Sequence, residues 1–82
     1  MWMSNLYIVI DRENVDRNTL HDIAAAIAHG GATIFGIDED NYVIEAAMPS
    51  SELPTVRAME GICYVRSAFT YFRTVSAPAR AA

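Results

Sequence analysis

The chain has 82 residues, of which 52% are hydrophobic and 20% charged, so it is long enough for one small domain and no more. This length excludes the large enzyme folds, and the composition excludes a disordered tail or a collagen-like repeat. A domain of this size buries only about 60% of the surface of its unfolded chain. We therefore expect a modest core that is stabilised by a partner or by a second copy.

The acidic and basic residues are unevenly divided along the chain. Residues 1–41 hold seven acids and two arginines, residues 42–82 hold three acids and four arginines, and no acid follows Gly61. The net charge of −4 argues against a nucleic-acid partner. No apolar run approaches the length of a membrane span, and no signal peptide is visible. We therefore expect a cytoplasmic protein that binds neither nucleic acid nor membrane.

The first half of the chain predicts a strand, a helix and a second strand. Residues 6–10 form a continuous apolar run rich in β-branched side chains, which is typical of a central strand. Helical spacing follows in Leu20, Ile23, Ala24, Ile27 and Ala28. The candidate caps of this helix are Thr19, Asn18 and Asp16. Gly30 and Gly31 supply a left-handed stop before a strand over residues 32–37.

The second half predicts a strand, a short helix and a last strand. Residues 42–48 should pair antiparallel with residues 32–37 across the polar loop 38–41. A second helix opens at residues 49–51 and ends at Gly61, with one face formed by Leu53, Val56 and Met59. The last strand begins at residues 62–65 and continues to residue 72, a length that suggests a bend or an extended arm.

This order of elements, β-α-β-β-α-β, is the plan of the ferredoxin-like fold. We expect an α+β domain over residues 1–75, with two helices on one face of a four-stranded antiparallel sheet, and a flexible tail over residues 76–82. The other face of the sheet is left open. The candidates for that face are members of the alternating sets Tyr7 and Val9, Tyr42 and Ile44, and Tyr64 or Val65 with Phe69 and Tyr71. The sequence alone leaves the parity of each strand undecided.

The polar residues form no catalytic or metal-binding pattern. His21 and His29 lie eight residues apart on one helix, which is too far for a shared metal ion, and the helix dipole favours His29 at the end of that helix. The acids of residues 38–40 lack the ligand spacing of a calcium loop. Cys63 lies in an apolar run and is expected to be a small buried side chain. We expect no enzyme activity, no metal and no cofactor.

Three stretches together resemble a known family. They are residues 7–10 (YIVI), residues 29–34 (HGGATI), and residues 53–56 (LPTV) leading to residues 60–65 (EGICYV). Over residues 6–66 the chain looks like the subtilisin propeptides and the free-standing peptidase inhibitors related to them. The resemblance implies that the open sheet face packs on a subtilisin-like protease while the C-terminal segment enters its active-site cleft.

These observations favour a small non-catalytic domain that binds a protein partner or forms a homodimer through its open sheet face and long last strand. The alternatives are a propeptide-like inhibitor of subtilisin-type serine proteases and a regulatory module that binds a small molecule. The predicted partner-binding residues lie on the last strand and the arm: Tyr64, Arg66, Phe69, Tyr71, Phe72, Arg73 and Pro78.

Overall fold

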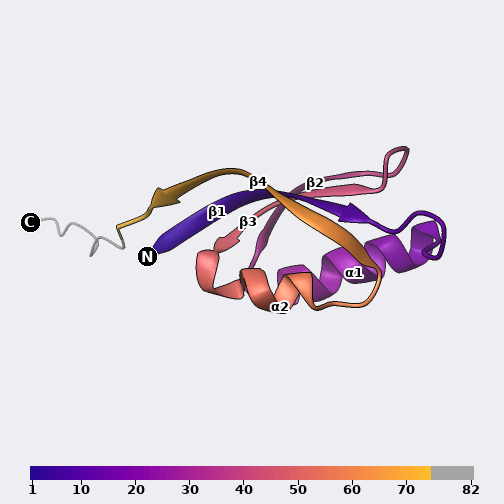
Figure 1. Ribbon diagram of the computed structural model, residues 1–82, viewed down its shortest axis with the longest axis horizontal. Helices are drawn as coiled ribbons and strands as arrows, with labels where there is room; N and C mark the ends of the chain where they lie inside the picture. Colours follow the sequence, from indigo (N-terminus) through magenta and orange to yellow (C-terminus); the bar gives the residue numbers. More distant parts are fainter. Residues whose placement is uncertain (75–82) are drawn as a thin grey trace, which may run out of the picture.

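The computed structural model describes residues 1–74 (Figure 1). The elements in chain order are β1 (Trp2–Ile10), α1 (Arg17–His29), β2 (Thr33–Asp38), β3 (Val43–Pro49), the 3-10 helix η1 (Ser50–Glu52), α2 (Leu53–Arg57) and β4 (Ile62–Phe72). The predicted tail over residues 76–82, which includes Pro78, lies outside the described residues, as does the last residue of the predicted domain 1–75.

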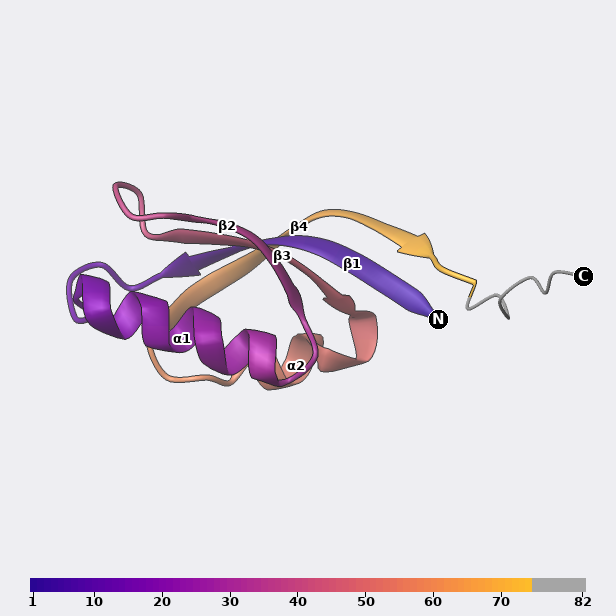
Figure 2. The ribbon, with the colours of Figure 1, turned by 180° about the vertical axis from the view of Figure 1, so that it is seen from behind.

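The strands form one antiparallel sheet in the order β2-β3-β1-β4. Both helices lie on the same side of this sheet, as the two opposite views show (Figures 1 and 2). The prediction of an α+β domain with a four-stranded antiparallel sheet and two helices is therefore confirmed. β1 lies at the centre, paired with β3 on one side and with β4 on the other, whereas β2 and β4 form the edges.

The core lies between the sheet and the helices. Leu6, Ile8 and Ile10 alternate along β1 and all point toward the helices, where they are buried. Four residues of the predicted stripe on α1 are buried, Leu20, Ile23, Ala24 and Ile27, whereas the fifth, Ala28, is exposed. Val56 of α2 is buried beside them, with Leu53 and Met59 partly buried as the predicted face requires. One hydrophobic cluster therefore holds the two layers together.

Both ends of α1 follow rules that can be seen in the sequence. Of the three candidate caps, the structure selects Asp16, which has extended backbone and accepts a hydrogen bond from the Thr19 backbone N–H at 2.8 Å. After His29 the chain leaves the helix at Gly30, and Gly31 then adopts a φ of 111°, in the left-handed region that glycine favours.

The structure corrects the proposed open-face pair on β3. Ile44 pairs with Ile8 and is 0% exposed, so its side chain lies in the core rather than on the open face. Tyr42 precedes β3 with a φ of 54° and packs partly buried against the core, with the Arg12 guanidinium 5.9 Å from the centre of its ring. Because Ile44 faces the core, the open-face residues of β3 are the odd-numbered ones. β3 also begins one residue later than predicted.

β4 follows its prediction in length, and of the two open-face alternatives its register selects Tyr64 with Phe69 and Tyr71. Its register against β1 shifts twice, once in the middle of their pairing and once at the end of β1, so that Ala68 and Cys63 have no direct partner on β1. Because Cys63 occupies one of these bulges, its thiol is exposed, and the prediction of a buried cysteine is wrong. The bulge at Ala68 reverses the alternation of side chains along β4, so that Phe69 faces the same side as Arg66.

β3 ends at Pro49, opposite Met3 of β1. Beyond that point residues 1–2 and 72–73 continue the pairing of β1 with β4 as a short two-stranded arm. Trp2 and Phe72 form an edge-to-face pair there, with ring centres 5.2 Å apart. Two residues along β1 from Trp2, the Ser4 hydroxyl lies 2.7 Å from the Ser50 hydroxyl and 3.2 Å from the Thr70 hydroxyl. These hydroxyls tie β1, β4 and η1 together, and they explain how the nearly fully buried Ser4 is tolerated.

The loop between β2 and β3 is organised by its acids. The Asp38 carboxylate accepts hydrogen bonds from the backbone N–H groups of Asp40 and Asn41 and from the Asn41 side chain. Glu39 reaches across to His21 of α1, with Oε2 and Nε2 2.7 Å apart. These bonds lower the pKa of Asp38, chiefly through the Asn41 side chain, and that of Glu39, chiefly through His21.

The first prediction concerns the turn before β4. Gly61 has a φ of 90°, and an added Cβ would lie 3.0 Å from Cδ1 of Ile23 and 3.2 Å from Cγ2 of Val15. Gly61→Ala should therefore lower the free energy of unfolding by at least about 1–2 kcal/mol, measured by urea denaturation. Gly30→Ala is the matched control, because its nearest contact would be 3.4 Å and its φ is −76°. Equal urea midpoints for the two variants would contradict the argument.

The second prediction concerns acid stability. The carboxyls of Asp16, Asp38 and Glu39 all have a lowered pKa when folded, so their contribution is present above their unfolded pKa values of about 4. It is lost as the pH falls through the folded values. The melting temperature should thus decrease below about pH 5, and less steeply in Asp38→Asn than in the charge-matched control Asp22→Asn. Identical slopes for both variants in thermal melts at pH 3–6 would refute this role of Asp38.

Candidate interaction face

The face of the sheet opposite the helices is the candidate functional surface, and its residues follow from the strand register. Tyr7 of β1 lies directly opposite Glu45 of β3 and Arg66 of β4, so these three side chains form one row across the sheet. The neighbouring rows lie on either side of this one. The open face comprises Asn5, Tyr7 and Val9 from β1, Val43, Glu45 and Ala47 from β3, Tyr64, Arg66, Phe69 and Tyr71 from β4, and Phe35 from β2.

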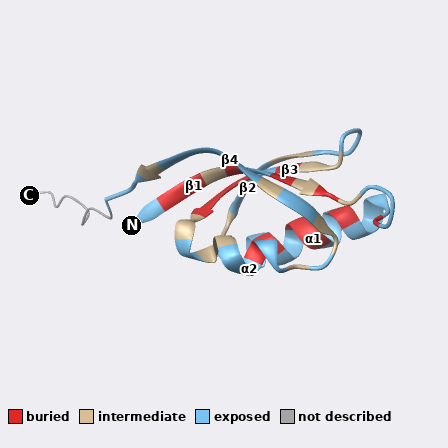
Figure 3. Cartoon of the chain, viewed as in Figure 1, coloured by how far each residue is buried: buried red, intermediate tan, exposed pale blue. Residues whose placement is uncertain are grey.

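The open face exposes large apolar side chains. Tyr7, Phe35, Tyr64 and Phe69 are each 41–60% exposed. Figure 3 shows the imbalance along the sheet, because β1 and β3 are largely buried whereas β4 is exposed over most of its length. Exposed single apolar residues are ordinary, but a contiguous group on one sheet face is typical of an interaction surface.

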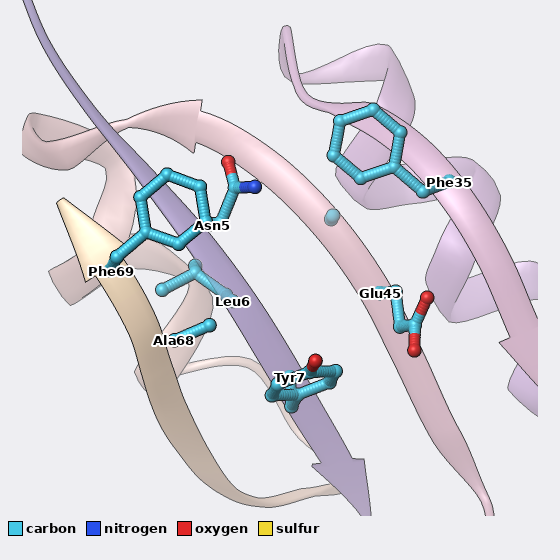
Figure 4. A pocket seen from close by; sticks show the side chains of 8 residues that line it. Asn5, Leu6, Tyr7, Phe35, Glu45, Ala68 and Phe69 are labelled. Carbon is cyan, nitrogen blue, oxygen red and sulfur yellow. The ribbon is translucent and has the colours of Figure 1, made fainter. Parts of the chain in front are cut away.

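A shallow hollow of about 100 Å³ lies in the middle of this face (Figure 4). Phe69 from β4 and Phe35 from β2 stand on its two sides, with Asn5 between them. The Glu45 carboxylate and the Tyr7 ring complete its lower part in that view. The hollow therefore combines aromatic walls with a carboxylate and an amide.

The amide of Asn5 is the one side chain of the described region with an unsatisfied buried polar atom. Its Oδ1 is shielded from solvent and accepts no hydrogen bond from residues 1–74. Leaving such an acceptor without a donor costs about 1–3 kcal/mol. Asn5 lines the hollow, but its Oδ1 is not exposed there, so a donor in the hollow would reach this oxygen only after the amide turned.

Two opposite charges flank the centre of the open face. Glu45 and Arg66 stand on either side of Tyr7, and neither forms an ion pair within the described part of the chain. Asp38 ends β2 in the next row, but its carboxylate is engaged by the loop. The centre of the face is thus neutral overall, with its acid on the β3 side and its base on the β4 side.

The structure brings together part of the predicted site. Tyr64, Arg66, Phe69 and Tyr71 all lie on the open face, and the rings of Phe69 and Tyr71 are 5.6 Å apart. Phe72 points to the other side, where it contacts Trp2. Arg73 lies at the end of the arm, where its backbone exchanges hydrogen bonds with Met1. The predicted binding set therefore divides between two surfaces.

Sequence reasoning missed five residues of this surface, including Val43 and Ala47 of β3. Phe35, Glu45 and Asn5 line the hollow, although no pattern singled them out. The alternation along β1 would have placed Asn5 beside Tyr7 if the strand had been extended to its observed start. Glu45 required the correct parity of β3, and Phe35 lies where the pairing of β2 with β3 is irregular.

Nothing in residues 1–74 gathers three or more metal-ligating side chains. Within the same residues, no helix is long and apolar enough to cross a membrane. The Ser4, Ser50 and Thr70 hydroxyls lie near one another, but the hydrogen bonds of this cluster join only hydroxyls. A nucleophilic hydroxyl requires an adjacent base as its hydrogen-bond partner. Since these hydroxyls bond only to one another, the cluster has the geometry of a structural contact.

Comparisons with known proteins leave the family of the chain open. Models of protein families, curated proteins and solved structures were all searched, and none of them matched.

Proposed function

We propose that this chain is a non-catalytic protein-interaction domain that forms a homodimer through its open sheet face. The element order and the sheet order β2-β3-β1-β4 support a ferredoxin-like plan, in which the face opposite the helices is available for a partner. The observation that carries the proposal is the group of exposed aromatic side chains on that face, with Tyr7 at its centre.

The dimensions of the face suit a modest interface. Four strands spaced by about 4.8 Å and six residues spaced by about 3.4 Å give a surface of roughly 20 by 20 Å. This area of about 400 Å² per copy is below the ~600 Å² per partner at which stable specific interfaces begin, so the dimer should be weak and transient. We therefore expect a dissociation constant in the micromolar range, at about 1–50 μM.

A second copy suits this surface better than a strongly charged partner. The face presents one free acid and one free base at its centre, so it has no net charge to complement. A twofold dimer uses the same surface on both copies, and such an interface must be complementary to itself. Burying the aromatic side chains against their own copies also extends the small core of the domain.

The third prediction tests the face with two matched substitutions on the same strand. Phe69→Thr removes an aromatic ring from the open face and should weaken the dimer at least about tenfold, because central aromatic residues dominate interface energies. Phe72→Thr removes the same ring from the arm, where exposure is 57% against 55% for Phe69, and should leave the association constant unchanged. Sedimentation equilibrium over about 1–200 μM measures both constants.

Two outcomes would count against the proposal. A monomeric mass over the whole concentration range would overturn it. Equal effects of Phe69→Thr and Phe72→Thr would indicate a surface that includes the arm instead of the open face. Circular dichroism spectra of both variants control for loss of the fold, and a dimer that dissociates only because Phe69→Thr unfolds would not support the proposal.

Inhibition of a subtilisin-type serine protease is a second candidate function. The same open face and the course of β4, which runs along the edge of the sheet toward the C-terminal segment, favour it. In this function the face would pack on the protease while an extended segment lies in its cleft as an added strand.

The fourth prediction separates the two candidates. As an inhibitor, the intact chain at equal molar concentration should abolish hydrolysis of a chromogenic peptide by a subtilisin-type protease, and Phe69→Thr should weaken the inhibition. As a homodimer only, the chain should leave the initial rate unchanged. Rapid digestion of the chain with no lag in peptide hydrolysis would exclude the inhibitor.

A further inference from the structure

We infer that Arg66 of one copy occupies the Asn5 and Glu45 hollow of a second copy, in a dimer whose twofold axis runs nearly parallel to β1. This inference rests on the proposed dimerisation through the open face, and it specifies the partner residue and the orientation of the two copies. It follows from the order of residues in the rows of the sheet.

The charged row distinguishes the possible twofold axes. When two copies are stacked face to face, an axis along β1 brings β4 of one copy over β3 of the other. Arg66 then lies over Glu45 of the second copy, and the symmetry repeats this pair. An axis across the strands at Tyr7 would instead bring Glu45 over Glu45 and Arg66 over Arg66. Charge complementarity therefore favours the axis along β1.

The sizes of the side chains in the neighbouring rows favour the same axis. Phe69, which is opposite Asn5, would lie over Ala47 of the second copy, and Tyr64 would lie over Val43. Each large side chain of β4 thus meets a smaller one of β3. The axis across the strands would bring Phe69 over Tyr64 and Ala47 over Val43, which crowds one side of the interface and leaves the other unfilled.

The chemistry of the hollow matches a guanidinium group. Its lining includes the Glu45 carboxylate, which is an acceptor, and an arginine carries donors only. The rings of Phe35, Phe69 and Tyr7 line the same hollow, and aromatic faces attract guanidinium groups. A long side chain is also needed, because two stacked sheets lie about 10 Å apart.

The volume of the hollow points to a side chain of the second copy rather than a cofactor. Sites for small molecules typically enclose about 300–1,000 Å³. The hollow measures about 100 Å³, which leaves room for the end of one side chain. Arg66 is exposed, makes no ion pair with the described residues, and belongs to the same face, so a twofold dimer supplies it without any further partner.

Charge reversal tests the pairing. Arg66→Glu and Glu45→Arg should each weaken the wild-type homodimer at least about tenfold, because each places like charges in both pairs. The double variant Arg66→Glu with Glu45→Arg should recover most of the affinity. An equimolar mixture of the two single variants should form a heterodimer, because every pair in it is again of opposite charge. Arg57→Glu, on the exposed surface of α2, controls for the change in net charge.

Sedimentation equilibrium and circular dichroism measure association and folding. If the single variants dimerise as wild type does while Phe69→Thr dissociates, the pairing is wrong and dimerisation through the open face stands. If the single variants dissociate but neither the double variant nor the mixture recovers, the pairing is likewise wrong. If the wild type is monomeric, both proposals fail. Should a reversed variant not fold, Glu45→Gln and Arg66→Gln must each weaken the dimer for the inference to hold.

Discussion

Two helices can cover only one face of a four-stranded sheet, and this constraint governs the whole molecule. β1 shows it most clearly, because Leu6, Ile8 and Ile10 are buried under α1 while the residues between them point to the opposite side. The helices bury the first set, Leu6, Ile8 and Ile10, almost completely. Since strand side chains must alternate, the second set has nowhere to go except the open face. The open face is thus a geometric consequence of how the core is built.

The elements of the fold could be predicted because each has a local signal. The stripe that begins at Leu20 matches the buried face of α1, and the acidic loop before Tyr42 lies between β2 and β3. The early strand was predicted too short because Ser4 and Asn5 separate Trp2 and Met3 from the apolar run that follows. Ser4 is instead accommodated by a hydroxyl from η1, and such a distant contact leaves no periodic pattern in the sequence.

The open face was harder to predict because it depends on register. A shift of one residue moves every side chain of a strand to the other face, and pattern alone cannot detect it. The bulge at Ala68 is an example, since it places Phe69 and Tyr71 on the open face and turns Phe72 away. Cys63 shows the same limit, because an apolar sequence context predicts burial only where the strand keeps its alternation. The chemical character of the surface was predictable, but its exact membership was not.

The arm formed by β1 and β4 also has a consequence for the connectivity of the chain. The amino group of Met1 donates to the carbonyl of Arg73 at 3.0 Å, and the Arg73 N–H donates to the Met1 carbonyl at 2.7 Å. β4 and β1 are therefore placed like the two strands of a hairpin whose loop has been cut. A short turn joining Arg73 to Met1 would close that hairpin, and the loop between β2 and β3 could then be opened to give new ends. Such a circular permutant would retain every strand pairing of the sheet while reversing the order in which its two halves are synthesised.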